Sequence, residues 1–446
     1  MNTLATIADS LAAGTTTARR LVEDCLARIA DPEGEGGRVF LKLHTETALA
    51  SADAADTLRR AGRAPSPYAG IPISVKDLFD IKGETTKAGS VILDDAPVAL
   101  ATAPAVARLE AAGFITLGRT NMTEFAFSGL GINPHHGTPR SPWDRATGRI
   151  PGGSSSGAAV SISDGMAYAA LGTDTGGSCR TPAAMCGVVG YKPTARRVPI
   201  TGVLPLAPSL DSVGPLANSV ACCAIIDAIM AGGSGARLTP ISLSGLRLAV
   251  PTNIMLDALD PAVSDAFVRV LDVLEAAGAE LVDVLFPAMG EIAGANARGG
   301  ITAPESYAWH RPMMVEHSAG YDPRILKRIE RGIGISAADF LDTLAARAAI
   351  IARMAAATAD YDALIMPTCP LLPPSIASLD DEAEYNRVNQ LQLRNTAIGN
   401  FLDRCAISLP CHEIGEAPVG LMLMGETMGD ARLLRIAAAV EAALVE

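Results

Sequence analysis

Residues 151–180 read PGGSSSGAAVSISDGMAYAALGTDTGGSCR and place two glycine- and serine-rich segments on either side of a helix and a strand. The small residues of 158–166 predict a helix, and the apolar run 168–172 predicts a short buried strand. The flanking segments, dense in Gly, Ser and Thr, predict loops. A strand and a helix bounded by such loops are typical of an α/β enzyme.

Strands and helices keep alternating on both sides of this stretch. Helices are predicted within 3–29, at 261–277 and at 430–445, and strands at 71–77, 246–251, 364–367, 407–410 and 419–424. No internal repeat or low-complexity linker divides the chain. We therefore predict one α/β domain over residues 1–446, with a large mixed, mostly parallel twisted sheet covered by helices.

Composition excludes several classes of function. The chain has 446 residues, 49% of them hydrophobic, and a formal net charge of −12 without a Lys/Arg run, which argues against nucleic acid as a partner. No apolar stretch is long enough to span a membrane, and no secretory signal begins the chain, so we expect a cytoplasmic protein. The eight cysteines show no CxxC pair, so no metal site is predicted.

The two glycine-rich serine clusters, 151–157 and 172–180, are candidates for chemistry. Glycines let backbone N–H groups approach a reacting centre without a Cβ in the way, as an oxyanion pocket requires. Neither cluster contains G-x-x-x-x-G-K-[ST], so a phosphate-binding loop is disfavoured. Taken singly, each cluster is equally explained as a turn.

Together the clusters resemble a known family. Residues 151–157 resemble the GGSS(S/G)G element of the amidase signature family, and 172–180 resemble its G-x-D-x-G-G-S-x-R element. Further matches are GIPISVKD at 70–77, GRTNMTEF at 118–125 and the G-x-x-G-x-K-P turn at 187–193. The similarity covers essentially the whole chain, with the motif-bearing core at about 66–216 and a variable segment at about 287–350. It implies the amidase signature fold.

The resemblance implies that Ser178 attacks a carbonyl, that Ser154 relays the proton and that Lys76 accepts it. A serine hydroxyl is a poor nucleophile without an adjacent base. A lysine acts as a base only when neutral, and burial favours the neutral form. The alternative for Lys76 is an ordinary ion pair with Asp77 or Asp80.

The resemblance also implies the geometry around these groups. The Gly153-Ser154 peptide bond is expected to be cis. The backbone N–H groups of Thr175, Gly176, Gly177 and Ser178 are expected to form the oxyanion hole. Ser155, Asp174 and Arg180 are expected to hold the two loops in place; the alternative for Arg180 is contact with an acidic substrate.

The implied activity is that of an amidase-type hydrolase, which cleaves C–N acyl bonds of amides, anilides or carbamates (a urethanase) through an acyl-enzyme. Esters present the same carbonyl to the nucleophile and are further candidates. No metal or organic cofactor is required. The expected partner is a small-molecule amide or carbamate, and a homodimer fits the family.

Two alternatives remain open. Residues 153–157 also satisfy G-x-S-x-G, which would make Ser155 the nucleophile of an α/β-hydrolase esterase with His310, His317 or His412 as base. The poor strand character of the residues before it disfavours this assignment. The family also includes the A subunit of aminoacyl-tRNA amidotransferase, a glutaminase that works within a complex.

Variable segments are expected to contact the substrate, namely 129–135 with Gly129, Leu130, Gly131 and Ile132, 201–206 and 299–335. The last segment contains Tyr307, Trp309, Met313 and Met314, which suit an apolar or aromatic substrate. The alternative is that these side chains only pack the lid.

Overall fold

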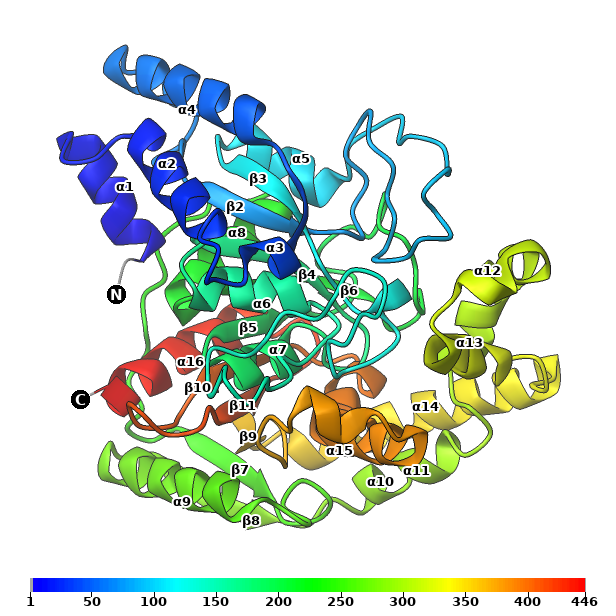
Figure 1. Cartoon of the computed structure of the whole chain (residues 1–446). Helices are drawn as coiled ribbons and strands as arrows, with labels where there is room; N and C mark the ends of the chain where they lie inside the picture. The colour runs from blue at the N-terminus through cyan, green and yellow to red at the C-terminus, as the bar shows by residue number, and fades with distance from the viewer. Residues whose placement is uncertain (1–2, 446) are drawn as a thin grey trace.

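The computed structural model describes residues 3–445 and contains one 11-stranded sheet with helices on both sides (Figure 1). The strand order is β1-β3-β2-β4-β6-β5-β10-β11-β9-β7-β8. The strands are β1 Phe40–Leu43, β2 Pro72–Lys76, β3 Ile115–Thr120, β4 Ala169–Asp174, β5 Val189–Lys192, β6 Ser212–Ala217, β7 Arg247–Pro251, β8 Glu280–Val284, β9 Ala363–Pro367, β10 Ala406–Pro410 and β11 Gly420–Met424. The single α/β domain with a mixed sheet is confirmed.

The expectation that parallel pairs predominate is wrong. Of the ten pairings between neighbouring strands, four are parallel and six are antiparallel. The connection from β10 to β11, residues 411–419, is too short to hold a crossover helix, so these strands must pair antiparallel. Parallel pairs join β2 to β3 and β4, and β7 to β8 and β9.

Helices cover the sheet in two layers. They are α1 Leu4–Ala13, α2 Ala18–Ile29, α3 Gly36–Val39, α4 Thr45–Arg60, α5 Pro104–Ala111, α6 Ser156–Ser163, α7 Arg180–Cys186, α8 Val220–Met230, α9 Pro261–Ala276, α10 Pro287–Gly290, α11 Ile292–Ala295, α12 Thr302–His317, α13 Pro323–Glu330, α14 Ala337–Thr358, α15 Glu382–Phe401 and α16 Asp430–Val445. Short 3-10 turns lie at Glu124–Ala126, Ser318–Gly320 and Ile376–Leu379. The helices and strands expected from the sequence are present, with ends shifted by a few residues.

Alternation along each strand assigns the two layers. In β2, Ile73 and Val75 face the cluster packed by α1, α5, α8, α9 and α16. Ser74 points the other way and hydrogen-bonds Ser161 of α6 at 2.9 Å. Side chains alternate between the faces of a strand, so Lys76 follows Ser74 onto the α6 side. The first serine loop lies on that same side, because its last residues begin α6 at Ser156.

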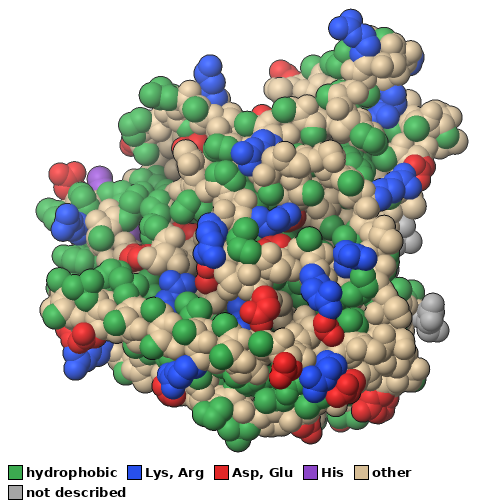
Figure 2. Space-filling view, turned by 180° about the vertical axis from the view of Figure 1, so that it is seen from behind, with side chains coloured by type: hydrophobic (Ala, Val, Ile, Leu, Met, Phe, Trp, Pro, Cys, Tyr) green, Lys and Arg blue, Asp and Glu red, His purple; other side chains and the backbone are tan. Residues whose placement is uncertain are grey.

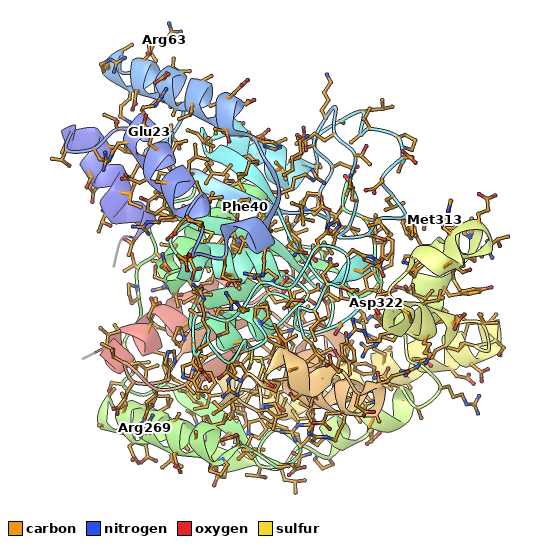
Figure 3. All side chains as sticks on the ribbon, viewed as in Figure 1. Glu23, Phe40, Arg63, Arg269, Met313 and Asp322 are labelled. Carbon is orange, nitrogen blue, oxygen red and sulfur yellow. The ribbon has the colours of Figure 1, made fainter. Side chains whose placement is uncertain are left out.

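The surface agrees with the charge analysis. On the face shown in Figure 2, basic and acidic side chains are interspersed and no broad basic field appears. Within residues 3–445, no helix is both long and apolar enough to cross a membrane. The α12–α14 segment forms one edge of the molecule, where Figure 3 shows Met313 on α12 and Asp322 just before α13.

Candidate active site

Lys76 ends β2 and is fully buried, with an exposed fraction of 0%. Its Nζ donates to Ser154 Oγ at 2.8 Å and to Thr173 Oγ1 at 2.7 Å. Among the described residues it forms no ion pair, since Asp77 is bound by Arg119 at 2.6 Å. Burial lowers the pKa of Lys76 to about 8, which brings the neutral amine within reach near neutral pH. The ion-pair alternative for Lys76 is therefore not found.

Ser154 lies directly against this amine in a tightly enclosed loop. The Gly153-Ser154 peptide bond is cis, as expected. Ser154 is fully buried, and its carbonyl accepts a hydrogen bond from Thr123 N at 3.1 Å. Gly153 N donates to Gly129 O at 2.8 Å, so the backbone at Gly129 supports the loop that carries Ser154.

Ser178 lies on the second loop and is 5% exposed. Ser155 N donates to Ser178 O at 3.3 Å, which joins the two loops. Within residues 3–445 the Ser178 hydroxyl has no hydrogen-bond partner, and the residue lines a cavity of about 250 Å³. The structure thus places Lys76 against Ser154, and binds Ser178 to the same loop through the backbone of Ser155.

Three of the four residues expected to form the oxyanion hole face the cavity. Thr175, Gly176 and Ser178 line the cavity, and among the described residues their N–H groups have no acceptor. Gly177 differs, because its N–H donates to Asp174 Oδ1 at 2.9 Å and the residue does not line the cavity. In this structure the Gly177 N–H therefore faces Asp174 within the turn, unlike the N–H groups of the other three residues expected to form the oxyanion hole.

Asp174 and Arg180 form the buried support of this turn. Asp174 accepts from the N–H groups of Gly177 and Cys179, and Arg180 Nη2 donates to Asp174 Oδ1 at 2.9 Å. Burial alone would raise the pKa of Asp174, but the charge and hydrogen bonds of Arg180 outweigh it and lower the pKa to about 2. Asn400 of α15 completes the group by accepting from Arg180 at 2.7 Å. Arg180 is thus engaged within the protein.

Ser155 is fully buried and donates to Thr173 O at 3.3 Å. None of the three candidate histidines lies against it. His310 hydrogen-bonds Tyr321 at 2.9 Å, His412 contacts the backbone of Val419, and His317 is exposed on α12. This geometry supports a structural role for Ser155 and disfavours the nucleophile-elbow alternative.

The cavity beside Ser178 is built by segments from across the chain. It is lined by Ala126, Phe127, Ser128, Thr175, Gly176, Ser178, Leu206, Leu210, Asn296, Gly299, Gly300, Ile301, Thr302 and Arg328, and on α15 by Asn389, Leu393, Ala397, Asn400 and Phe401. Of the segments expected to contact substrate, 201–206 and 299–335 therefore contribute at Leu206, 299–302 and Arg328. The residues of α15 had not been expected from the sequence.

Residues 129–132 are not part of this lining; 126–128 are. Leu130 and Ile132 pack with Ile150 in a separate buried cluster, and Gly131 lies so close to Gly152 O that a Cβ there would sit 2.2 Å from it. The side chains of Leu130 and Ile132 are therefore buried in this cluster and do not reach the cavity. The four aromatic and methionine side chains of α12 likewise pack against the cluster around Phe125.

Arg328 of α13 lies within the segment 299–335 that was expected to contact substrate, but the sequence did not single it out. It is 7% exposed, donates to Phe127 O at 3.0 Å and to Asn386 Oδ1 at 3.2 Å, and its Nε is without a partner. Within residues 3–445 no carboxylate pairs with it. It lines both the main cavity and a neighbouring polar cavity of about 130 Å³. A buried cation without an acid is costly, so the position favours an anionic ligand group.

No group of three or more His, Cys, Asp or Glu side chains that could hold a metal ion is found among residues 3–445.

Known proteins that are similar to this chain over most of its length include amidases and amidotransferase subunits. Residues 20–434 match the model of the Amidase family. The chain is 40% identical to 2-amino-5-chloromuconic acid deaminase of Comamonas testosteroni over 407 residues, 89% of this chain and 86% of that protein. It is 34% identical to the A subunit of glutamyl-tRNA(Gln) amidotransferase from Chromohalobacter salexigens, over 98% and 95% of the two chains. A solved amidase superimposes with a TM-score of 0.89 at 32% identity and covers 99% of each chain. The chain therefore belongs to the Amidase family and is a hydrolase of carbon–nitrogen bonds.

Proposed function

We propose that this protein hydrolyses a small amide by acyl transfer to Ser178, with Ser154 as proton carrier and Lys76 as base. The observation that carries the proposal is the buried Lys76 amine, which is paired with no carboxylate among the described residues and lies 2.8 Å from Ser154 Oγ. A lysine in such a place destabilises the fold while it is charged, and is retained where a neutral amine is useful.

The reaction proceeds in two halves. Ser178 Oγ attacks the carbonyl carbon while its proton moves to Ser154 Oγ, and Ser154 passes its own proton to the lone pair of neutral Lys76. The oxyanion receives N–H groups of Thr175, Gly176 and Ser178. The C–N bond then breaks, and the leaving nitrogen takes a proton back along the same path. Water, deprotonated along that path, releases the acid and regenerates Ser178.

The cavity supports a compact substrate with a negatively charged group. Its volume of about 250 Å³ suits a small molecule, and Arg328 supplies a cation without an internal acid. We infer that the substrate carries a carboxylate that Arg328 binds. The name of the 40% identical relative, a deaminase of a muconic acid derivative, agrees with an acidic substrate. Anilides and carbamates of the same size present the same carbonyl to Ser178.

The test is a panel of short amides, anilides and carbamates, each as a free carboxylate and as its methyl ester. Ser178→Ala is expected to abolish turnover and Lys76→Met to reduce it by at least about 10³-fold at pH 7. Arg328→Gln is expected to raise KM for carboxylate substrates and to spare the esters. Normal activity of Ser178→Ala refutes the mechanism, whereas an unchanged preference in Arg328→Gln refutes only the substrate class.

A second candidate is the glutaminase component of an amidotransferase. The near-complete coverage of A subunits by this chain favours it. Glutamine also carries a carboxylate, so Arg328 serves either function. The discriminating measurement is glutamine hydrolysis by the isolated chain and by cell extract fractionated by size, because the second candidate requires that the activity emerge only within a complex.

A further inference from the structure

Helix α15 contacts the second serine loop directly and is linked to the first through Gly129, although it lies more than 200 residues after both in the chain. Near its start, Asn389 Oδ1 accepts from Ser128 Oγ at 2.9 Å and from Gly129 N at 2.8 Å. Gly129 in turn accepts from Gly153 N, next to Ser154. One face of the helix thereby supports the first loop.

Near its end, the same helix holds the turn before Ser178. Thr396 is fully buried and donates to Gly176 O at 2.7 Å. On the other side of the same peptide unit, Gly177 N donates to Asp174 Oδ1 at 2.9 Å. The peptide between Gly176 and Gly177 is therefore clamped at both its carbonyl and its N–H.

Asn400, one helical turn further, ties Asp174 to α15. Its Nδ2 donates to Asp174 O at 3.0 Å and to Asp174 Oδ1 at 2.9 Å, while its Oδ1 accepts from Arg180. Helix α15 thus binds both the Gly176–Gly177 peptide and the Asp174 carboxylate that holds its N–H.

We propose that Thr396 and Asn400 are positioning residues, which hold the turn so that the N–H groups of Thr175, Gly176 and Ser178 converge on the developing oxyanion. This inference rests on the proposed function of Ser178. Thr396 does not line the cavity, so its contribution reaches the substrate only through the turn. An oxyanion hole depends on donors fixed before the reaction, and small displacements are costly.

The experiment compares Thr396→Val, Thr396→Ser and a matched control, Thr343→Val. Thr343 is also a nearly buried helical threonine, but its hydroxyl donates to Asp339 O of its own helix and it lies outside the cavity. Rates are expressed per folded active site, counted with a covalent serine reagent. Affinity is measured for a boronic acid that mimics the acyl part and forms a tetrahedral adduct with serine.

Thr396→Val is expected to lower kcat by about 10- to 100-fold with little change in KM, and to weaken boronate binding by a similar factor. Thr396→Ser keeps the hydroxyl and restores most of both, and Thr343→Val resembles the wild type. Asn400→Ala supplies a second measurement if Thr396→Val fails to fold; because Asn400 also lines the cavity, the expected result is the same loss of boronate binding together with little change in KM.

If the wild type depends on Ser178 but Thr396→Val and Asn400→Ala bind the boronate normally, the positioning role is overturned and the proposed function stands. If Ser178→Ala is active, both fall together. A rise in KM alone in Thr396→Val also overturns the inference, because it would show an effect on substrate binding rather than on the transition state.

Discussion

Titration of Lys76 provides the sharpest test of the chemistry. Burial lowers its pKa from 10.5 to about 8. Because only the neutral amine accepts a proton, activity should rise with pH: about 1% of the amine is neutral at pH 6 and about 90% at pH 9. We therefore expect kcat/KM to increase roughly 90-fold between these values, with a midpoint near pH 8.

The same shift predicts a change in stability. The unfolded chain binds the Lys76 proton up to about pH 10.5 and the folded chain only up to about pH 8, so between these values stability rises with pH. Below pH 8 the buried charge costs about 3 kcal/mol. Lys76→Met removes this cost and also the hydrogen bonds to Ser154 and Thr173, worth about 1 kcal/mol each. We expect a net gain in stability of about 1 kcal/mol at pH 7, in a variant whose activity is strongly reduced.

The assays are kcat/KM from pH 6 to 10 and urea unfolding of wild type and Lys76→Met at pH 7 and pH 10. The stability advantage of the variant should disappear and reverse at the higher pH. Lys192 is the control, since burial also lowers its pKa to about 8 while its Nζ donates to Pro193 O, away from both serines. Lys192→Met should leave the activity midpoint in place. A flat pH profile, or a midpoint that moves with Lys192→Met, would refute the reasoning.

Two further predictions concern packing and buried charge. A Cβ on Gly177 would sit 2.2 Å from Thr396 Oγ1 at a φ of +136°, so Gly177→Ala should lower the free energy of unfolding by about 1–3 kcal/mol and lower kcat. A Cβ on Gly176 meets open space, so Gly176→Ala should unfold at nearly the wild-type urea concentration. Equal losses of stability in the two variants would contradict the hydrogen-bonded clamp on the Gly176–Gly177 peptide. Burial raises the pKa of Glu441 to about 7, so the stability of the folded chain falls as pH rises from 4.5 to 7. Glu441→Gln keeps an acceptor for Val220 N but carries no charge. In urea unfolding it should be more stable than wild type by about 1–3 kcal/mol at pH 8 and equal to it near pH 4.5. A difference that does not change with pH would speak against the buried charge.

Much of the fold was predictable because its signals are local. Alternation located β2, short apolar runs located β4, β7 and β9, and helical spacing located α1, α2 and α9. The direction of strand pairing was misjudged, although the short 411–419 connection required an antiparallel pair. Pairing direction depends on how long each connection is, and an alternation of strands and helices does not reveal it.

Helix α15 escaped prediction for a physical reason. Its buried face carries polar side chains, among them Asn389, Gln392, Thr396 and Asn400, so it lacks the apolar stripe that marks a core helix. Asn389, Thr396 and Asn400 are buried because each finds a partner in a loop more than 200 residues away, and such partners are invisible to a local pattern.

The sequence by itself determined which residues are chemically able to react, since lysine, two serines and glycine-rich loops are recognisable as types and in order. Only the tertiary structure decided which N–H groups remain free and that the Gly177 N–H donates to Asp174. It also decided that Arg328 lines the cavity without a paired carboxylate, and that α15 binds the second loop and supports the first through Gly129. Hydrogen-bond saturation and burial are properties of neighbours in space, and the chain brings those neighbours together only when it folds.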